Sequence, residues 1–465
     1  MRIFLLIFTT CMLLACSRPT PILDQIKQDG ELVVITRNSP TTYYEGAEGF
    51  TGFEYDLVQR FADELGVSVR FIIPDSFTEI LPAISRKEAH FAAAGLTVTK
   101  ARESLVRFGP AYQKITQQLM YRTGTYRPRK ITDIIGSTLE IIAGSSHEEE
   151  LNRLKQKHPD LEWEARKDIE SDELLYLLKE QVIDYTIADS NEAALNQRYY
   201  PELKPAIDLT EPQSLAWAFP HSEDSSLYKA ALKFFKKAKK DGTLKHLIER
   251  HYGHVEKLNF VDKRTFKRHS ITRLPQYKAL YKKAALENDI DWKLLAAIGY
   301  QESHWNPRAK SPTGVRGIMM LTMATAKQLG IKSRLDPAQS IDGGSRYIKM
   351  MEKKIPEQIK NPDRLWMTLA SYNIGYGHLE DARKLTQKTG GDPNKWADVK
   401  QTLPMLSKKK WYKKTRHGYA RGREAVTYVD SIRSYYDILV WLENQQNKQP
   451  EVAEPAPLSI SPAVL

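Results

Sequence analysis

The first hundred residues alternate short apolar runs with amphipathic stretches. The apolar runs cover residues 32–35, 69–73 and 91–94, and stretches with helical spacing cover residues 53–65 and 77–84. A strand followed by a helix and another strand is typical of a parallel sheet with helices packed on its faces. The pattern therefore predicts a βαβαβ arrangement and an α/β domain in this part of the chain.

The chain is long enough for more than one domain, and its charge is unevenly divided. Its 465 residues allow two or three domains, each with its own core. Residues 1–258 carry a net charge of −4 and residues 259–446 carry +17, within a total of +12. A basic half attracts polyanions, of which nucleic acid is the usual one. For any one basic run, a solvated face without a dedicated partner is the alternative.

The N-terminus has the composition of a short export signal. Arg2 precedes an apolar run of roughly a dozen residues, which is too brief to span a bilayer as a helix. The quartet that ends at Cys16 resembles the processing box of bacterial lipoproteins. That resemblance implies removal of residues 1–15 as a signal peptide, lipidation of Cys16 and retention at the periplasmic face of the outer membrane, because Ser17 is not the Asp associated with inner-membrane retention. An uncleaved hydrophobic stretch is the alternative.

Export restricts the chemistry and the partners of the chain. Cys11 and Cys16 are the only two cysteines in the sequence, so a processed chain has no free thiol and no internal disulfide. Thiolate and redox chemistry are therefore excluded, and nucleic acid is not expected as a partner. His246, His251 and His254 do not share one helix face, so we expect no metal site and no cofactor.

Glu302 is the strongest candidate for a catalytic group. Asp291 is a candidate helix cap, and Leu295, Ile298 and Glu302 follow at helical spacing, with Pro307 ending the helix soon afterwards. A carboxyl on an apolar helix face loses hydration, which raises its pKa toward the value that a general acid needs. An ordinary glutamate near a helix end is the alternative.

Four segments, in order, resemble the catalytic-domain motifs of family 1 lytic transglycosylases. They are Glu302-Ser303, Gly317-Ile318-Met319-Met320-Leu321, Ala370-Ser371-Tyr372-Asn373 and Tyr428-Val429. The match covers roughly residues 270–445 and implies a mainly α, lysozyme-like domain. The family commonly has Gln where this chain has Met320, which removes one hydrogen-bonding group from the substrate site.

The resemblance implies cleavage of the β-1,4 bond between N-acetylmuramic acid and N-acetylglucosamine in peptidoglycan. The C6 hydroxyl of the muramic acid attacks C1, no water is consumed and a 1,6-anhydro end forms. Glu302 would first protonate the leaving oxygen and then take the hydroxyl proton, so one carboxylate suffices where the usual glycosidase needs two. Peptidoglycan is itself anionic, so runs such as Lys408 to Lys410 could help to hold it.

Six further residues are expected to contact the substrate. Tyr372 and Asn373 would orient Glu302 or the sugar, and Tyr419 or Tyr428 would supply a stacking face or a hydroxyl donor. Ser311 and Met320 belong to the same substrate-binding segments. Core packing is the alternative for the three tyrosines.

Residues 22–258 resemble family 3 periplasmic solute-binding proteins, which implies a bilobal domain. In that family a backbone amide, a hydroxyl and an Arg receive a ligand α-carboxylate, which places these roles on Gly95, Thr97 and Arg102. In the second lobe, Ser146 would contact the same anion and Asp189 would receive an ammonium group. The implied ligand is an amino acid or a muropeptide, and the alternative roles are surface caps or salt bridges.

The sequence therefore predicts two folded domains between two terminal segments. They are a signal peptide over residues 1–15, a bilobal α/β solute-binding-like domain over 16–258, a mainly α lytic transglycosylase domain over 259–446 and a disordered tail over 447–465. The first domain is expected to be non-catalytic, with ligand sensing and a spacer role as alternatives. For the whole chain, a lysozyme-type hydrolase and a catalytically silent peptidoglycan or amino-acid sensor are the competing functions.

Overall fold

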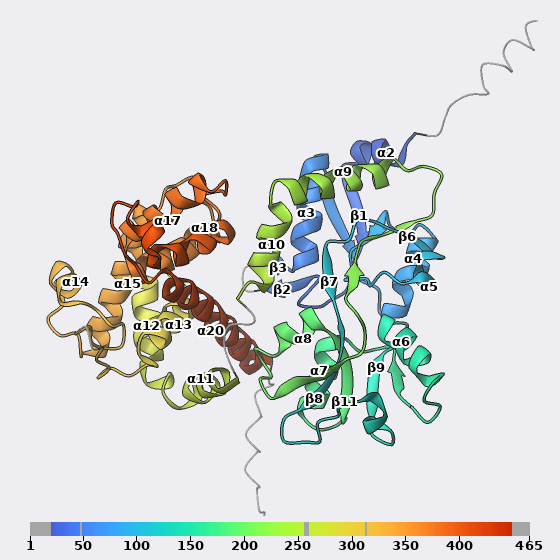
Figure 1. The fold of residues 1–465 in the computed structure, drawn as a ribbon, viewed down its shortest axis with the longest axis horizontal. Coiled ribbons are helices and arrows are strands. Elements are labelled where there is room, and N and C mark those ends of the chain that lie inside the picture. The colour runs from blue at the N-terminus through green and yellow to red at the C-terminus, as the bar shows by residue number, and fades with distance from the viewer. Residues whose placement is uncertain (1–19, 47–48, 255–259, 312–313, 449–465) are drawn as a thin grey trace, which may run out of the picture. The chain divides into compact units, whose positions relative to one another are not determined.

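The computed structural model describes residues 20–46, 49–254, 260–311 and 314–448 (Figure 1). The chain divides into two compact units, one of residues 1–193 and 203–248 and the other of residues 194–202 and 249–465. The predicted signal peptide, Cys16 and residues 449–465 of the predicted tail lie outside the described residues.

The first sheet of the first unit has five strands in the order β4-β1-β5-β14-β6. β1 (Glu31–Ile35) is parallel to β4 (Ser68–Ile72) and β5 (Phe91–Ala92), whereas β14 (Ala218–Pro220) is antiparallel to β5 and to β6 (Val106–Phe108). The same lobe contains α2 (Ile22–Asp29), α3 (Phe53–Leu65), η1 (Phe77–Glu79), α4 (Ile80–Ser85), α5 (Lys100–Glu103) and α9 (Ser226–Lys240), with α10 (Thr243–Tyr252) following. The predicted βαβαβ order is confirmed.

Helix α3 illustrates how the apolar spacing forms this lobe. Phe53, Leu57, Val58 and Phe61 are all buried, and they recur at intervals of three and four. The helix ends at Gly66, whose φ of +75° is the left-handed conformation that glycine adopts at low cost. The periodicity of the sequence therefore determines the buried face of the helix, and Gly66 determines its end.

The second sheet has five strands in the order β10-β9-β11-β8-β12. β9 (Leu139–Ile142) is parallel to β10 (Glu164–Arg166) and β11 (Tyr185–Asp189), while β8 (Gln117–Arg122) is antiparallel to β11 and β12 (Leu203–Asp208). Its helical elements are η2 (Ile131–Ile134), α6 (Ser146–Lys155), α7 (Ser171–Lys179) and α8 (Ser190–Asn196). Every residue of β9 and β11 is buried, as expected for strands covered on both faces.

The chain passes between the two sheets twice. It leaves the first sheet after β6 through β7 (Gln113–Ile115) and returns before β14 through β13 (Gln213–Leu215), and these two strands pair antiparallel. A separate hairpin joins β2 (Tyr44–Gly46) and β3 (Gly49–Thr51). Two sheets joined by two crossing strands make a bilobal α/β unit, which confirms the predicted fold class.

The second unit is built from helices. They are α11 (Phe260–Thr272), α12 (Pro275–Glu287), α13 (Trp292–Ser303), α14 (Met323–Gln328), α15 (Pro337–Lys354), α16 (Asp363–Ile374), α17 (Tyr376–Lys388), α18 (Trp396–Thr402), η3 (Leu403–Ser407), α19 (Lys409–Tyr412) and α20 (Gly422–Lys448). α13 packs against α12 and α20, and α16 packs against α15, α17 and α20. The prediction of a mainly α domain is confirmed.

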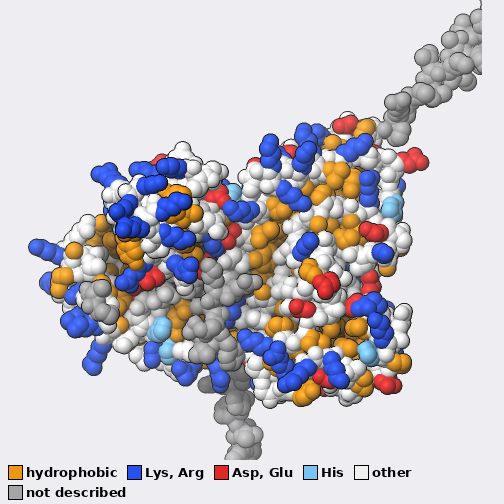
Figure 2. Space-filling view, in the orientation of Figure 1, with side chains coloured by type: hydrophobic (Ala, Val, Ile, Leu, Met, Phe, Trp, Pro, Cys, Tyr) orange, Lys and Arg blue, Asp and Glu red, His pale blue; other side chains and the backbone are white. Residues whose placement is uncertain are grey.

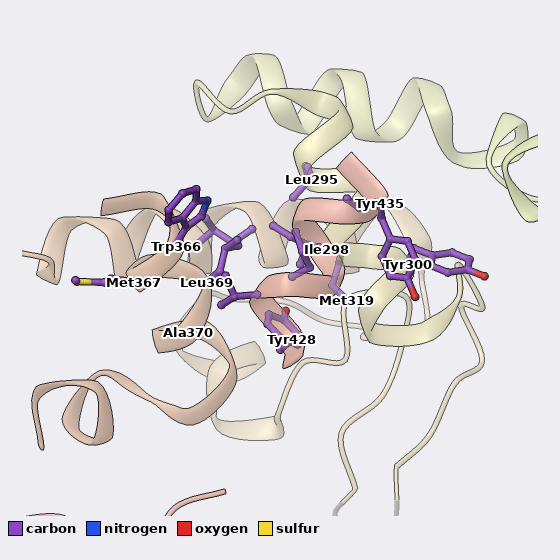
Figure 3. Close-up of a cluster of buried hydrophobic side chains, with 14 of the residues drawn as sticks. Leu295, Ile298, Tyr300, Met319, Trp366, Met367, Leu369, Ala370, Tyr428 and Tyr435 are labelled. Atoms are coloured by element: carbon purple, nitrogen blue, oxygen red, sulfur yellow. The ribbon is translucent and has the colours of Figure 1, made fainter. Parts of the chain in front are cut away.

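Helix α13 lies in the core of this unit (Figure 3). It begins where the sequence predicts, because the Asp291 carboxylate accepts a hydrogen bond from the backbone N–H of Lys293 at 2.7 Å. Its residues from Leu295 to Tyr300 are all buried. At Gly299 an added Cβ would lie 2.0 Å from the hydroxyl oxygen of Tyr281, so only glycine permits this approach of α12.

Candidate active site

Glu302 lies in the last turn of α13, and its side chain is partly buried. Burial raises the pKa of its carboxyl to about 7, and a hydrogen bond from Tyr428 offsets part of that rise. The Tyr428 hydroxyl donates this bond to Oε1 of Glu302 at 2.6 Å. Among the described residues, Tyr428 is the one group that hydrogen-bonds this carboxyl. A carboxyl with a pKa near 7 can give and take a proton at neutral pH.

The chain turns sharply directly after Glu302. His304 and Trp305 both have left-handed backbone conformations, with φ of +53° and +57°. Such conformations are unfavourable for residues with side chains and persist only where the surroundings enforce them. Trp305 is fully buried and its indole N–H donates to the carbonyl of Ala296 at 2.8 Å, while the ring of His304 stacks on Tyr300 at 4.7 Å. These contacts fix the end of the helix that carries Glu302.

Tyr372 and Tyr428 form an aromatic wall beside Glu302. Tyr372 comes from α16 and Tyr428 from α20, and their rings are stacked with centroids 6.4 Å apart. Burial and the neighbouring Glu302 raise the pKa of both hydroxyls well above the usual value. The Tyr372 hydroxyl donates to the carbonyl of Met319 at 3.0 Å, so its proton is engaged by the backbone. The ring of Tyr428 is buried in the core, so its hydroxyl is the part that faces the carboxyl.

The other predicted substrate residues occupy the surrounding loops and helix ends. Ser311 accepts a hydrogen bond at its hydroxyl from the backbone N–H of Val315 at 3.3 Å. Met320 is partly buried with a left-handed φ of +47°, and Asn373 is exposed in the last turn of α16. Tyr419 is 56% exposed. The structure thus joins Glu302 to Tyr428 by a hydrogen bond and Tyr428 to Tyr372 by ring stacking. Asn373 follows Tyr372 in α16, and Ser311, Met320 and Tyr419 lie outside the three helices that carry these residues.

Two structural partners of this site were not predicted from the sequence. The carbonyl of Met319 holds Tyr372, and the indole of Trp305 holds the helix end. The only local signal of the Trp305 contact is the presence of a large aromatic residue three positions after Glu302. The Met319 contact leaves no signal in the sequence, because its acceptor is a backbone carbonyl.

The predicted ligand groups of the first unit also come together, but other side chains of the same unit already pair with them. The Gly95 N–H, expected to face a ligand, donates to the carboxyl of Glu54 at 3.1 Å. Arg102 donates from Nε to Glu149 at 2.7 Å and from a terminal nitrogen to the carbonyl of Gly144 at 3.0 Å. The two contacts of Arg102 link the first lobe to the second.

The remaining predicted ligand groups, two in the second lobe and one in the first, are buried. Asp189 is hydrogen-bonded to His147 at 3.0 Å, and Ser146 is buried in the first turn of α6. Thr97 is buried and forms an isolated bridge with Leu215.

Two charged residues near these groups were missed by sequence reasoning. Arg37 pairs with Glu192 and, at 3.2 Å, with Glu170 across the lobes. Glu54 lies on the buried face of α3, where it also accepts bonds from Tyr112 and from the indole of Trp217, and burial raises the pKa of its carboxyl. A glutamate on an otherwise apolar helix face was the available signal for Glu54.

Comparison with known proteins identifies both halves of the chain. A family model for the transglycosylase SLT domain matches residues 279–394, and one for bacterial extracellular solute-binding proteins, family 3, matches residues 23–254. A membrane-bound lytic murein transglycosylase F of Saccharophagus degradans is 50% identical over 438 residues, which cover 94% of this chain and 87% of the relative. The chain belongs to the membrane-bound lytic murein transglycosylase F family. Another member, from Ectopseudomonas mendocina, is 47% identical over 453 residues, which cover 97% of this chain and 93% of the relative.

Solved structures resemble the first half of this family member. Holo ArgBP from T. maritima covers 49% of the chain and 98% of its own length, at 23% identity and a TM-score of 0.43. The substrate-binding protein AbpA from Streptococcus pneumoniae, bound to L-arginine, covers 50% of the chain and 98% of its own, at 22% identity and a TM-score of 0.45.

The names of the relatives describe members of the family as membrane-bound. Within residues 20–46, 49–254, 260–311 and 314–448, no helix is long and apolar enough to cross a membrane.

Proposed function

We propose that this chain cleaves the β-1,4 bond between N-acetylmuramic acid and N-acetylglucosamine in peptidoglycan, with Glu302 as acid and then base. Membership of the lytic murein transglycosylase F family supports the substrate and the reaction class. The observation that carries the residue assignment is the carboxyl of Glu302, whose pKa burial raises to about 7 beside a single tyrosine donor. Near neutral pH both of its protonation states are populated, which suits a group that must donate a proton and later accept one.

The proposed reaction conserves every atom of the substrate. Glu302 gives its proton to the glycosidic oxygen as the bond from C1 to that oxygen breaks. The C6 hydroxyl oxygen of the same muramic acid bonds to C1, and its proton passes to the Glu302 carboxylate. The products are a free 4-hydroxyl on one fragment and a 1,6-anhydro ring on the other, and Glu302 is protonated again.

The surroundings of Glu302 favour this route over hydrolysis. A hydrolytic glycosidase commonly uses a second carboxyl about 5 to 9.5 Å from the first. Among the described residues, no other carboxyl contributes to the pKa of Glu302, whose shift arises from burial and from Tyr428. The proposed route needs no second carboxyl, because the substrate supplies its own nucleophile.

We assign Tyr428 a positioning role, Tyr372 a supporting role and the remaining predicted residues contacts with substrate. The Tyr428 hydroxyl fixes one carboxyl oxygen of Glu302, which leaves the other free to face the glycosidic bond. Tyr372 supports the turn that contains Met320 through its bond to the Met319 carbonyl. Ser311, Met320, Asn373 and Tyr419 are proposed as substrate contacts.

Mass spectrometry of digested peptidoglycan tests the reaction. We expect fragments with 1,6-anhydromuramic acid ends from the wild-type chain and none from Glu302→Gln. Reducing ends in place of anhydro ends would assign the chain to the lysozyme-type hydrolases. If the wild-type chain releases no fragments, the catalytically silent sensor is the better assignment.

We propose lipidation at Cys16 and attachment to the periplasmic face of the outer membrane. The support is the lipoprotein-like quartet that ends at Cys16, together with the membrane-bound relatives. Fractionation of cells should place the wild-type chain with outer-membrane lipoproteins and Cys16→Ser in a fraction without lipid label. Recovery of labelled Cys16→Ser would refute this anchor.

We further propose that the first unit binds an amino acid or a muropeptide between its lobes. The support is the cluster of Arg102, Ser146 and Asp189 at facing lobe edges, in a unit that matches solute-binding proteins. A ligand carboxylate must compete with Glu149 for Arg102, and a ligand ammonium must compete with His147 for Asp189. Thermal unfolding with and without added amino acids or muropeptides tests the binding; no shift with either class would favour a spacer role.

A further inference from the structure

A strongly basic surface segment leads into the helix that carries Tyr428 and includes the first two residues of that helix. Residues 408–423, called here the basic segment, contain five lysines and three arginines and no acidic residue. All eight cationic side chains are exposed. Within the described part of the chain, the one ion pair that they form joins Arg421 to Glu424 at 3.5 Å. Figure 2 shows many Lys and Arg side chains over the part of the second unit that holds α17 and α18.

The basic segment is held in place by contacts with the rest of the second unit. Trp411 packs against the hydrophobic core. The buried carboxylate of Asp381 accepts hydrogen bonds from the backbone N–H groups of Arg416 at 3.2 Å and His417 at 2.8 Å, and it also bonds the His417 ring at 3.2 Å. A fixed array of charges loses less conformational entropy on binding than a mobile one.

An exposed aromatic ring lies among these charges. Tyr419 is 56% exposed, and its ring meets the ring of Tyr412 edge to face with centroids 5.8 Å apart. An apolar ring face surrounded by cations complements a polymer that carries both sugar rings and negative charges.

The basic segment is continuous with the candidate active site. It runs directly into α20, and Tyr428 follows Arg423 by five residues, or about 8 Å along a helix. The basic segment also contacts α17 through His417. A Cβ added at Gly377 would lie 2.7 Å from Cδ2 of the His417 ring. Gly377 lies just beyond α16, which carries Tyr372.

We propose that the basic segment binds the carboxylates of the peptides attached to the glycan strand that is cleaved at Glu302. This inference rests on the proposed function, because it identifies the charged part of the same substrate. Peptide carboxylates spaced along a strand would meet several cations at once, and the forked donors of the arginines suit carboxylates well. The position beside the Glu302 site favours the peptidoglycan strand over a lipid surface.

The test combines a charge-neutralised variant with a charge-neutralised substrate. In the full chain, Lys408, Lys409, Lys410, Lys413 and Lys414 are replaced together by Gln. The matched control replaces five exposed lysines of the same unit, namely Lys282, Lys283, Lys353, Lys354 and Lys360, by Gln. The substrates are intact sacculi and sacculi whose carboxylates have been converted to neutral amides with carbodiimide and methylamine.

On intact sacculi we expect the segment variant to raise KM by about tenfold, as five weak exposed ion pairs would together, with kcat little changed. The control variant should stay near the wild-type KM. On amidated sacculi the wild-type and segment variant should have the same KM. Equal KM values for the segment and control variants, or a tenfold gap that survives amidation, would overturn the proposal.

Two further measurements separate this inference from its alternatives. Binding to phosphatidylglycerol vesicles should be similar for the segment and control variants; loss of vesicle binding with an unchanged sacculus KM would assign the segment to a lipid surface and refute the proposal. Glu302→Gln should bind sacculi as the wild-type does without cleaving them. The wild-type could produce reducing ends while the segment variant still shows the expected rise in KM. That outcome would contradict the proposed reaction but support the binding of peptide carboxylates by the basic segment.

Discussion

The Tyr428 hydroxyl donates a 2.6 Å hydrogen bond to Oε1 of Glu302, although 126 positions separate the two residues in the chain. This bond stabilises the ionised carboxylate and so lowers its pKa, against the larger effect of burial that raises it. The proton affinity of the candidate acid is therefore set by two helices that meet only in the folded unit.

Replacement of Tyr428 by Phe should raise the pKa of Glu302. Activity requires the protonated acid, so the alkaline limb of the pH–activity profile should move upward by about one pH unit, as expected for loss of one hydrogen bond to a charged group. Tyr436→Phe is the control, because that hydroxyl of the same helix bonds Asp291 instead. An alkaline limb that stays in place in Tyr428→Phe would contradict the positioning role.

Glu302→Gln should abolish cleavage and also change how stability depends on pH. The folded-state pKa of about 7 lies above the ordinary value, so the wild-type chain loses stability as the pH rises from about 4.5 to 7 and this carboxyl ionises. The loss should reach up to about 3 kcal/mol above pH 7. Thermal unfolding of the two proteins between pH 4 and pH 8 measures the difference. A difference that is constant across this range would show that Glu302 is not destabilised by burial.

Gly299→Ala should destabilise the second unit, whereas Gly to Ala inside a helix ordinarily stabilises. The added Cβ would lie 2.0 Å from the Tyr281 hydroxyl oxygen, an overpacking that costs about 1 to 3 kcal/mol. Removing that hydroxyl in the double variant with Tyr281→Phe should restore part of the lost stability, as followed by chemical denaturation. No recovery in the double variant would mean that another contact causes the loss.

Glu149→Gln should strengthen ligand binding by the first unit. It removes the carboxylate that pairs with Arg102 at 2.7 Å, so a ligand carboxylate no longer has to displace it, and we expect affinity to rise by about fivefold. Glu150→Gln is the matched control, since Glu150 pairs with Arg153 on the same helix. Calorimetric titration with amino acids or muropeptides distinguishes the two variants, and equal affinities would remove Arg102 from the proposed site.

The sequence predicted the fold well because the relevant signals are local. The apolar runs before and after α3 define parallel strands, and Asp291 with Leu295 and Ile298 defines the start and the buried face of α13. The upward direction of the pKa shift of Glu302 could be predicted from the same helical spacing, whereas the opposing effect of Tyr428 could not. These features depend on residues within a few turns of one another.

The pairings of the site residues could not be predicted in the same way. Tyr372 was expected to orient Glu302 or the sugar, yet its hydroxyl proton is taken by the Met319 carbonyl, 53 positions away. Gly95 was expected to face a ligand, yet its N–H is taken by Glu54. Each donor bonds the acceptor that tertiary packing brings nearest to it. The distance from donor to acceptor depends on the folded structure and cannot be read from the residue type.

The proposed double role of Glu302 at the end of α13 has a consequence for proton supply during turnover. In the proposed reaction, the proton that leaves Glu302 for one sugar oxygen returns to it from another oxygen of the same substrate, so each catalytic cycle closes without exchange with the solvent. Turnover then needs neither buffer nor a supply of water at the reacting carbon. A chain of this kind needs no water molecule at the reacting carbon, whereas a hydrolytic glycosidase consumes one for every bond that it cleaves.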